Sequence, residues 1–535
     1  MKQTVFFRSR HRLLMGGAVL ALAGSLAAPA FATPDPVPGV DATGAQVIVT
    51  DQSKDGSPVS ASATNPLVEA TGAVDGSSVA ITGNAVSATA RANSAGAALT
   101  PDTRDLEAAT GGTWLATGTG GTDGQSPAVI ATRQSTDGAA VSATTANSRI
   151  RARLGDLVDS SAAVSGNTQE AVALANDATD TLSLTGVAVG TGASIVSDQS
   201  LGNDAAVAAR FSGTAALKVA DAPRSDLDVS DNLQRAVAYG NSISNALSAD
   251  AVQLDAAASY GAPSIVEANA SDPAVNAAYA VLADQRVSSA VTGSANGGFA
   301  VKVGDTAFAS DVTNGGNSLV AAGYGNQSSN GLDLSADAIA NNAWDGGAVA
   351  NITNVQSAAA IPMKGVAKGG ASIAITGDAV EANLDARDNA VLAVATANRA
   401  DGNLLSVTAN AVDAGEGVGG EGPVGTALVA GDGTMTVTAP FSVQNDQLNQ
   451  ARVTAKATDT ATLITVDTGI VRSNASITGN SAGAQASGNV ATNGLSLDAN
   501  SLATAVDLNS LQLGKGVISA SVGSADNRAG AVLSG

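Results

Sequence analysis

The sequence predicts an all-β fold: an elongated β-solenoid, or β-helix-like stack, of degenerate strand–turn–strand repeats joined by variable loops. From residue 45 onward, short runs of Val, Ile and Ala alternate at period two and are broken by Gly, Asn, Asp and Ser. Aromatic residues make up only 2% of the chain, although hydrophobic residues make up 44%. Because small side chains cannot fill a thick interior, such a composition suits thin, closely packed layers.

The first 32 residues have the features of a secretory signal peptide. A basic start precedes an apolar run over residues 13–26, and Ala30, Phe31 and Ala32 form a small-residue cleavage signature. No Cys follows this signature, which argues against a lipoprotein signal. The predicted segments are a signal peptide at 1–32, a Pro-rich linker at 33–44, a degenerate β-repeat region at 45–525 and a C-terminal tail at 526–535.

Removal of this signal changes the chemistry available to the mature chain. Four basic residues and no acidic ones are lost, so the formal charge goes from −21 to about −25, and His11, the single histidine, is lost as well. A chain without His or Cys cannot form Ser-His-Asp or Cys-His catalytic sets, disulfides, or the usual zinc, copper and haem sites. Its acidity disfavours nucleic acid and anionic membranes as partners.

A frame of fixed spacing recurs five times and defines the repeat. Gly or Asp is followed by Asn, by small residues at the fifth, seventh and ninth positions, by a second Asn at the tenth and by Leu at the sixteenth. The best copy begins at Gly479 and contains Ala484, Ala486, Gly488 and Asn489. Alternate residues of a strand share a face, so the small residues predict a close-packed face. The other copies begin at Gly83, Gly166, Asp231 and Gly316.

Each copy is interpreted as a strand, a turn and a second strand. The second Asn suits the turn, and the Leu-x-Leu pair that follows gives the second strand a larger inward face against which the small face packs. Asn stacked over Asn predicts side-chain amide ladders along the stack. Modules stacked about 4.8 Å apart predict a long, stiff rod.

Other stretches are read as imperfect copies or remain open. The segment from Ser372 to Ala382 matches residues 78–88, and the segments that begin at Thr50 and Thr132 lead at the same distance into Val-Ser-Ala. The irregular spacing of the copies predicts variable loops rather than a fixed coil length. Residues 272–286 have a capping Asp and an early Pro, so they fit either a short helix or a strand.

The residues that could carry chemistry are few. Asp226, Asp228 and Asp231 are closely spaced carboxylates, which a solvated strand edge explains better than a catalytic pair. The Gly-rich segment 118–124 has one Asp and is similar to calcium-binding turns, but a flexible loop is the favoured interpretation. We therefore expect no catalytic, cofactor-binding or metal site and no cofactor, although the net acidity allows loose Ca²⁺ binding.

Aromatic residues are too scattered to predict a sugar-stacking platform. Trp114 and Trp344 lie far apart in the sequence. Tyr239 and Tyr324 each precede Gly-Asn in their copies of the frame, so they are interpreted as one repeat position.

At its Gly-Asn…Asn frames the chain resembles the holdfast-anchor proteins of stalked bacteria, specifically their large D-type secreted component, within the wider class of Ala/Gly/Asn-rich β-repeat surface adhesins. The signal peptide, the acidity and the absence of Cys fit the same resemblance. It implies a non-enzymatic cell-surface anchor or adhesin that helps attach holdfast-type polysaccharide to the outer membrane. The implied location is the extracellular side of that membrane, and the implied partners are an outer-membrane secretion and anchor lipoprotein, curlin-like proteins and extracellular polysaccharide.

Two other functions stay open. Amide ladders also support association between chains, which would make the protein a self-assembling, curlin-like fibre or matrix subunit. A secreted polysaccharide lyase on a β-helix is the second alternative, and it would require Lys, Arg and Asp to converge in a groove.

Overall fold

A computed structural model describes most of the chain from residue 46 onward. The described residues are 46–101, 105–106, 120–123, 128–189, 192–255, 264–267, 274–275, 277–340, 348–415, 425–429, 433–437, 439–523 and 531–534. The chain divides into the units Met1–Pro38 and Gly39–Gly535, and all of the described residues belong to the second unit. Every regular element among the described residues is a β-strand, which confirms the all-β prediction.

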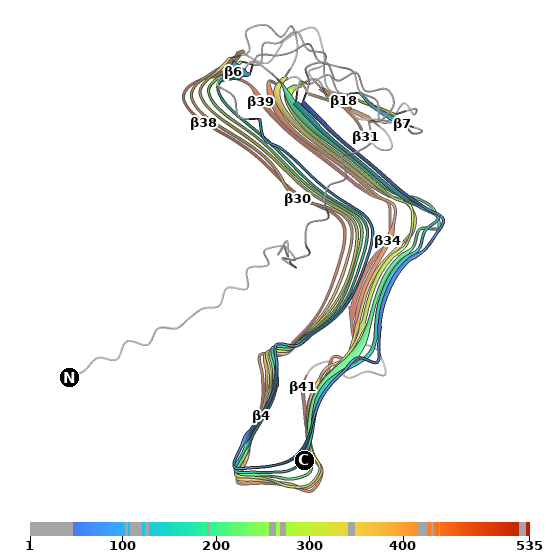
Figure 1. Cartoon of the computed structure of the whole chain (residues 1–535), viewed down its shortest axis with the longest axis vertical. Helices are drawn as coiled ribbons and strands as arrows, with labels where there is room; N and C mark the ends of the chain where they lie inside the picture. The colour runs from blue at the N-terminus through green and yellow to red at the C-terminus, as the bar shows by residue number, and fades with distance from the viewer. Residues whose placement is uncertain are drawn as a thin grey trace, which may run out of the picture. The chain divides into compact units, whose positions relative to one another are not determined.

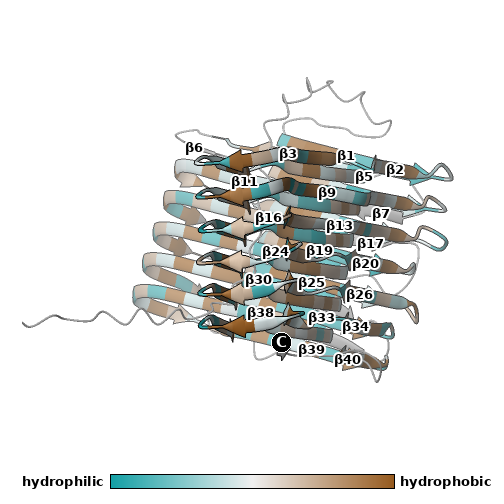
Figure 2. Cartoon of the chain, turned by 90° about the horizontal axis from the view of Figure 1, so that it is seen from below, coloured by the Kyte–Doolittle hydropathy of each residue, from teal (hydrophilic) through white to brown (hydrophobic). Residues whose placement is uncertain are grey.

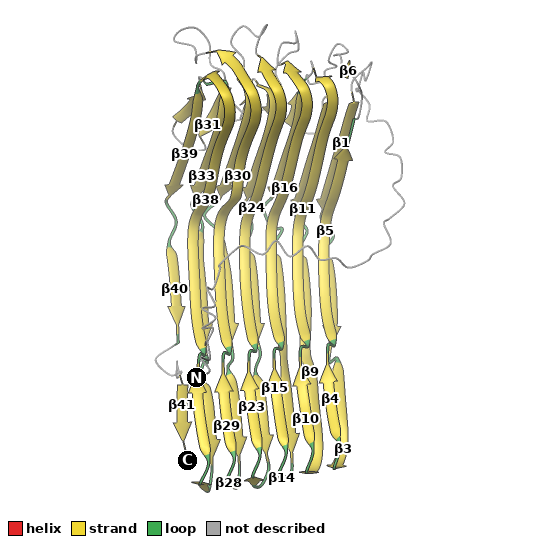
Figure 3. Cartoon of the chain, turned by 90° about the vertical axis from the view of Figure 1, so that its left-hand side faces the viewer, coloured by secondary structure: helices red, strands yellow, loops and turns green. Residues whose placement is uncertain are grey.

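The strands stack as the coils of a parallel β-solenoid. In each coil the chain passes through sheets A and B on one wall, turns, and returns through sheets C and D on the other wall (Figure 1). Equivalent strands of successive coils are parallel and in register (Figure 3). Examples are β1 (Gln46–Asp55) on β8 (Ala128–Asp137) and β11 (Thr168–Val189) on β16 (Leu233–Asp255). The predicted β-solenoid is therefore confirmed.

Sheets A and B together form one wall of the stack. Sheet A contains β1 (Gln46–Asp55), β8 (Ala128–Asp137), β12 (Ala193–Leu201), β19 (Ala277–Val287), β25 (Ala348–Ala358), β33 (Phe441–Asn449) and β39 (Val506–Gly514). Sheet B contains β2 (Val59–Thr64), β3 (Leu67–Asp75), β9 (Val141–Val158), β13 (Val207–Val219), β20 (Val291–Asn296), β21 (Phe299–Val303), β26 (Pro362–Lys368), β27 (Ala371–Ile375), β34 (Arg452–Thr458), β35 (Thr462–Val466), β40 (Ile518–Val522) and β41 (Ala531–Ser534).

The opposite wall and the turns complete each coil. Sheet C contains β4 (Ser78–Thr82), β10 (Ser161–Ser165), β15 (Asp226–Ser230), β23 (Asp311–Gly315), β29 (Asn383–Arg387) and β37 (Asn474–Thr478). Sheet D contains β5 (Ala85–Leu99), β11 (Thr168–Val189), β16 (Leu233–Asp255), β24 (Ser318–Ala340), β30 (Ala390–Gly415) and β38 (Ser481–Thr504), with β6 (Asp105–Leu106) beside β11. A small sheet between B and C contains β14 (Ala222–Pro223), β22 (Ala307–Phe308), β28 (Asp378–Val380) and β36 (Gly469–Val471).

The crossover from sheet D to the next sheet A explains the irregular repeat spacing. Stacked glutamines of sheet A are separated by 82, 65, 86, 71, 91 and 65 residues in successive coils. The longer crossovers include five strands that pair antiparallel with one another. These strands are β7 (Gly120–Asp123), β17 (Ser264–Glu267), β18 (Ala274–Val275), β31 (Gly425–Val429) and β32 (Gly433–Val437). The predicted variable loops thus lie at one place in every coil.

The longest direction of this unit follows the strands and not the stack. Seven strands of sheet A span about 29 Å at a spacing of about 4.8 Å, whereas the 23 residues of β16 alone extend for about 76 Å at about 3.3 Å per residue. The sequence predicted a rod whose long axis runs along the stack of modules. This direction is wrong, because the coils are few and each coil is long.

The interior contains two apolar clusters separated by buried amides. One cluster lies between sheets B, C and D and includes the fully buried Ile150 and Leu217. The other lies between sheets A and D and includes Leu182 and Phe441. Hydropathy bands that align from coil to coil reflect this repetition (Figure 2).

Buried asparagines form three ladders along the stack, as predicted. Each Nδ2 donates to the Oδ1 of the equivalent Asn in the next coil, at 2.8–3.0 Å. The first ladder comprises Asn84, Asn167, Asn232, Asn317, Asn389 and Asn480; the second comprises Asn93, Asn176, Asn241, Asn326, Asn398 and Asn489; the third comprises Asn245, Asn330, Asn403 and Asn493.

A glutamine ladder on sheet A faces the second asparagine ladder on sheet D. From Gln134 onward, each glutamine Nε2 donates to the Oε1 of the preceding coil at 2.7–3.0 Å. All of the ladder glutamines before Gln512 also donate to a backbone oxygen of sheet D, as Gln285 does to Gln327. In the other direction, asparagines of sheet D donate to backbone oxygens of sheet A, as Asn241 Nδ2 does to the backbone oxygen of Arg286. The side-chain amides of each wall therefore donate hydrogen bonds to the backbone of the other wall. The ladder comprises Gln52, Gln134, Gln199, Gln285, Gln356, Gln447 and Gln512.

The structure corrects the predicted strand–turn–strand module. Asn489 lies inside the continuous strand β38 and belongs to the second ladder, so it forms no turn. The turn lies at the first position of the frame, where Gly479 has φ of 65° and Asp388 has φ of 54°. Asp388 and Asn389 begin a copy that the sequence alignment missed, since Asn398 and small residues follow at the right distances.

Other predicted relationships have mixed outcomes. The segments beginning at Thr50 and Thr132 are in register, as predicted. Ser372 is not equivalent to Ser78, because it lies in β27 of sheet B and pairs with β21. Residues 272–286 contain β18 and β19, so the strand alternative holds and the helix does not.

Sheets B and D approach each other through small residues on both sides, which differs from the predicted packing of small against large. A Cβ placed on Gly293 of β20 would lie 2.0 Å from the backbone oxygen of Ala322 in β24. On the facing strands, Ala321 and Ala395 are fully buried. The close approach depends on the absence of a side chain, because there the backbone itself is the neighbour.

We expect Gly293→Ala to destabilise the fold by about 1–3 kcal/mol, since the added methyl group forces the two sheets apart. Gly331→Ala is the matched control, because its Cβ would meet only the backbone oxygen of Asn245 at 3.8 Å. Equilibrium urea unfolding of both variants measures the difference. Equal stability of the two variants would contradict the close approach.

We expect Gln285→Met to cost about 1–3 kcal/mol, because it leaves the amide of Gln356 and the backbone oxygen of Gln327 without their partner. Gln327→Met, on the outward side of sheet D, keeps the ladder and serves as the control. Thermal unfolding reports both changes, and a Gln285→Met variant as stable as its control would show that the ladder contributes nothing.

Candidate functional site

The closely spaced carboxylates of the sequence lie on the outer side of sheet C. Asp226 and Asp228 are in β15 and Asp231 is in the following turn, and together they line a hollow of about 610 Å³. Stacking adds Arg387 from β29, whose guanidinium lies 3.3 Å from Asp385. Carboxylates outnumber the single arginine, so the hollow is a poor fit for an acidic glycan. The other acidic residues that stacking brings to the hollow are Asp311 and Asp388.

Sequence reasoning missed these additions because they come from other coils. Asp311 pairs in register with Asp226, and Asp388 has the same frame position as Asp231. Knowledge of the coil register would have revealed the first, and recognition of the copy at Asp388 the second.

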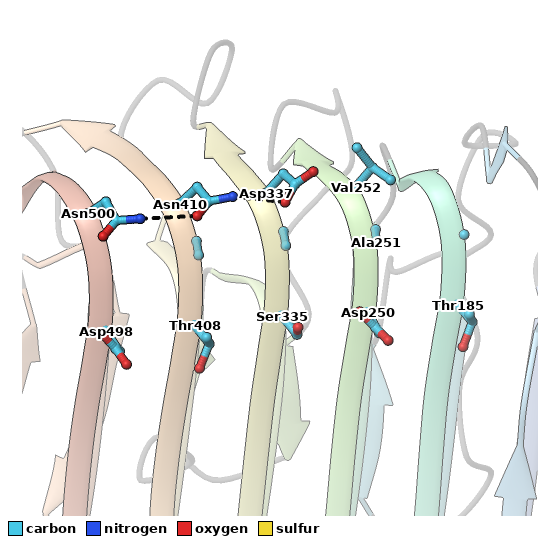
Figure 4. Close-up of a pocket in the computed structure, with 13 residues that line it drawn as sticks. Thr185, Asp250, Ala251, Val252, Ser335, Asp337, Thr408, Asn410, Asp498 and Asn500 are labelled. Atoms are coloured by element: carbon cyan, nitrogen blue, oxygen red, sulfur yellow. Dashed lines mark hydrogen bonds between the residues drawn. The ribbon is translucent and has the colours of Figure 1, made fainter.

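A polar gutter of about 590 Å³ runs across the outer side of sheet D (Figure 4). One of its rows contains one residue from each of five successive strands, held together by the parallel register. A second row is tied by Asn410 Nδ2, which donates to Asp337 at 3.0 Å, and by Asn500 Nδ2, which donates to Asn410 at 3.2 Å. The first row is Thr185, Asp250, Ser335, Thr408 and Asp498.

The gutter has the groups that bind hydroxyl-rich molecules. Its hydroxyl, amide and carboxylate side chains can donate and accept hydrogen bonds, and they repeat at the strand spacing of about 4.8 Å. The small residues Ala251, Ala336 and Ala409 lie between the rows. Because the rows run along the stack, the gutter suits an extended polymer better than a small molecule.

Tyr239 and Tyr324 are stacked on each other, with ring centroids 5.1 Å apart and an angle of 17° between the rings. This agrees with their interpretation as one repeat position, since the two residues pair in register. Burial raises the pKa of Tyr239 to about 12. The ring faces contact each other, so this pair is not an open platform for a sugar.

Asp180 is the buried carboxyl that replaces asparagine in the third ladder. It pairs in register with Asn245, and the hydroxyl Oγ of Ser197 lies 3.1 Å from Asp180 Oδ2 and 2.9 Å from Asn245 Oδ1. One hydroxyl proton cannot satisfy both acceptors fully, so the site has too few donors. Burial raises the pKa of Asp180, while the hydrogen bond from Ser197 opposes the shift.

We expect Asp180→Asn to stabilise the protein at neutral pH by roughly 1–2 kcal/mol, because the amide supplies the missing donor without a buried charge. The folded-state pKa of Asp180 lies above its ordinary value of 3.8, so its favourable protonated state is fully present at low pH and is lost as pH rises. The advantage of the variant should therefore shrink as pH falls toward 3.8 and be smallest below that value. Unfolding measured between pH 3 and 7 checks this, with the exposed Asp333→Asn as control; an advantage independent of pH would contradict it.

The remaining predictions concern metal ligands, the Gly-rich segment 118–124 and the two tryptophans. Among the described residues, no group of three or more Asp, Glu, His or Cys is placed to hold a metal ion. Within segment 118–124, only the backbone of β7 is described, so calcium binding there stays a prediction. Trp114 and Trp344 lie outside the described residues. In the part of the chain that the structure covers, no helix is long and apolar enough to cross a membrane.

Comparisons with known proteins give no match. No family model, no curated protein and no solved structure is significantly similar to this chain.

Proposed function

We propose that the chain is an exported, non-enzymatic surface anchor or adhesin that helps hold an adhesive polysaccharide at the bacterial outer membrane. The observation that supports this most is the wall made by sheet D. Four of its strands, β11, β16, β24 and β30, contain 22, 23, 23 and 26 residues and lie parallel and in register. A pull along the strands acts on the covalent backbone and shears many hydrogen bonds at once.

The interior ladders suit the same load-bearing role. Each asparagine of the second ladder bonds both to the ladder asparagine of a neighbouring coil and to the opposite wall, as Asn326 does to Asn398 and to the backbone oxygen of Ser357. Sliding one coil along the next would break these bonds and leave buried amides unpaired, at about 1–3 kcal/mol each. The stack therefore resists slippage without disulfides.

The gutter on sheet D is the proposed contact for polysaccharide. Its rows offer hydroxyl, amide and carboxylate groups along the stack, where a sugar polymer can exchange hydrogen bonds with several coils. The three carboxylates Asp250, Asp337 and Asp498 favour a neutral or cationic polymer over an acidic one. An acidic-glycan lyase is less well supported for the same reason.

A deletion strain tests the function directly. We expect adhesive matrix to be made but shed into the medium, and surface attachment to be lost. Matrix that is absent from both cells and medium would show a role in synthesis or export instead.

A gutter variant tests the proposed contact. Thr408→Ala combined with Asn410→Ala and Asp498→Ala should reduce retained matrix several-fold while leaving thermal stability near that of the wild type, since these side chains are exposed. Asp226→Ala with Asp311→Ala removes a matched pair of carboxylates from the other hollow and is the control. Full retention by the gutter variant would place the polysaccharide contact elsewhere.

A further inference from the structure

The coil that ends in β39 and β40 leaves inward-facing apolar side chains open. Val506, Leu508 and Ile518 are 53%, 46% and 49% exposed. Their register partners one coil earlier, Phe441, Val443 and Val453, are fully buried. Among the described residues no further strand pairs with β39 or β40, so this edge of sheets A and B is unpaired.

We infer that a second copy of this chain stacks head to tail on this edge, with its β1 and β2 continuing sheets A and B beyond β39 and β40. The inference does not rest on the proposed function. The partner is a second copy because β1 and β2 form the opposite edge of sheets A and B. Continuing the repeat register beyond β39 and β40 calls for an edge of this kind.

Backbone hydrogen-bonding groups at the two edges are complementary. Val453 N–H donates to Val517 O, so the odd-numbered residues of β40 face β34 and Ile518, Ala520 and Val522 direct their N–H and C=O groups to the open edge. At the other edge Val59 N–H donates to Ala140 O, so Ser60 and Ser62 direct theirs outward. Parallel pairing of β2 on β40 uses both sets.

The glutamine ladder has a direction that this contact preserves. Each Nε2 donates to the preceding coil, which leaves an Nε2 proton at Gln52 and the Oε1 of Gln512 as the terminal groups. Head-to-tail stacking places the Gln52 amide of the second copy on the Gln512 carbonyl, as in every interior step. Head-to-head stacking would bring like groups together.

The side chains of the two edges also match. Strand β40 reads Ile-Ser-Ala-Ser-Val and β2 begins Val-Ser-Ala-Ser-Ala, so continued register places Ser on Ser outside and Ala520 on Ala61 inside. Neither strand contains a charged residue. Edge strands of monomeric proteins are usually protected by charge, which is missing from β2 and β40, whereas β1 contains Asp51, Lys54 and Asp55 and β39 contains Asp507.

The size of the contact sets its strength. Sheet A has seven strands but sheet C has six, so the stack ends on half a coil and only the wall of sheets A and B makes the contact. In β39, β40 and β41 it involves 18 residues, fewer than the roughly 20–30 residues per side of a standard interface. The association is therefore reversible and depends on concentration.

Two proline variants and their mixture test the inference by sedimentation of the full chain over a range of concentrations. Ala520→Pro and Ser60→Pro each remove one N–H that points to an open edge, without loss of an internal hydrogen bond. We expect the wild type to form dimers and longer chains as concentration rises, and each variant alone to stay monomeric. A mixture of the two variants should stop at the mass of two chains, because each keeps the edge that the other has lost.

Ala520→Ser keeps the N–H and should associate like the wild type, while circular dichroism confirms that each variant is folded. Should Ala520→Pro fail to fold, Ser519→Lys combined with Ser521→Lys provides a second block through charge, with Ser60→Pro as its partner in the mixture. A wild type that stays monomeric at all concentrations overturns the inference. So does association of either variant alone, which would indicate another interface.

Discussion

Buried side-chain amides are the constraint on which this structure depends. An amide in an apolar interior is costly unless its donors and acceptor are paired, and here the amides of the ladders pair with one another from coil to coil. A shift of one residue would move Asn241 away from both Asn176 and Asn326 and direct its side chain to the wrong face. The ladders therefore fix the register between coils whose lengths differ widely. They require an asparagine or glutamine at the equivalent strand position of each coil, whatever the length of the crossover between coils.

The same constraint explains why small residues accompany the asparagines. For glutamine of sheet A and asparagine of sheet D to reach the backbone of the opposite wall, the walls must lie close together. Fully buried alanines such as Ala395, and glycines such as Gly293, permit this approach. The low aromatic content fits this constraint, since large rings tend to separate the walls. The buried rings of the two clusters are Phe211 and Phe299 in the first and Tyr279 and Phe441 in the second.

The repeated frame was enough to predict the β-solenoid, the close-packed face and the ladders, because these depend on spacing within one strand. The interpretation of Asn489 as a turn failed for a local reason. Gly488 and Asn489 both face the interior, as do Ala397 and Asn398. The alternation of inward and outward side chains therefore breaks at this point of the strand, and in a sequence such a break looks the same as a turn. The outer gutter could not be predicted, since it joins residues of five coils and the crossover lengths hide their register.

A stack whose rungs are interchangeable has no internal feature that specifies how many coils it contains. Each interior glutamine of the ladder accepts the same bond from one neighbour that it donates to the other, so the terminal Gln52 and Gln512 differ from the others in the ladder bond that each one lacks. The same repetition produces the outer rows and the unpaired edges. The proposed binding along the wall and the proposed association at the ends would therefore be two consequences of one periodic arrangement, and variants of the outer rows and of the edge strands can separate them because they change different surfaces.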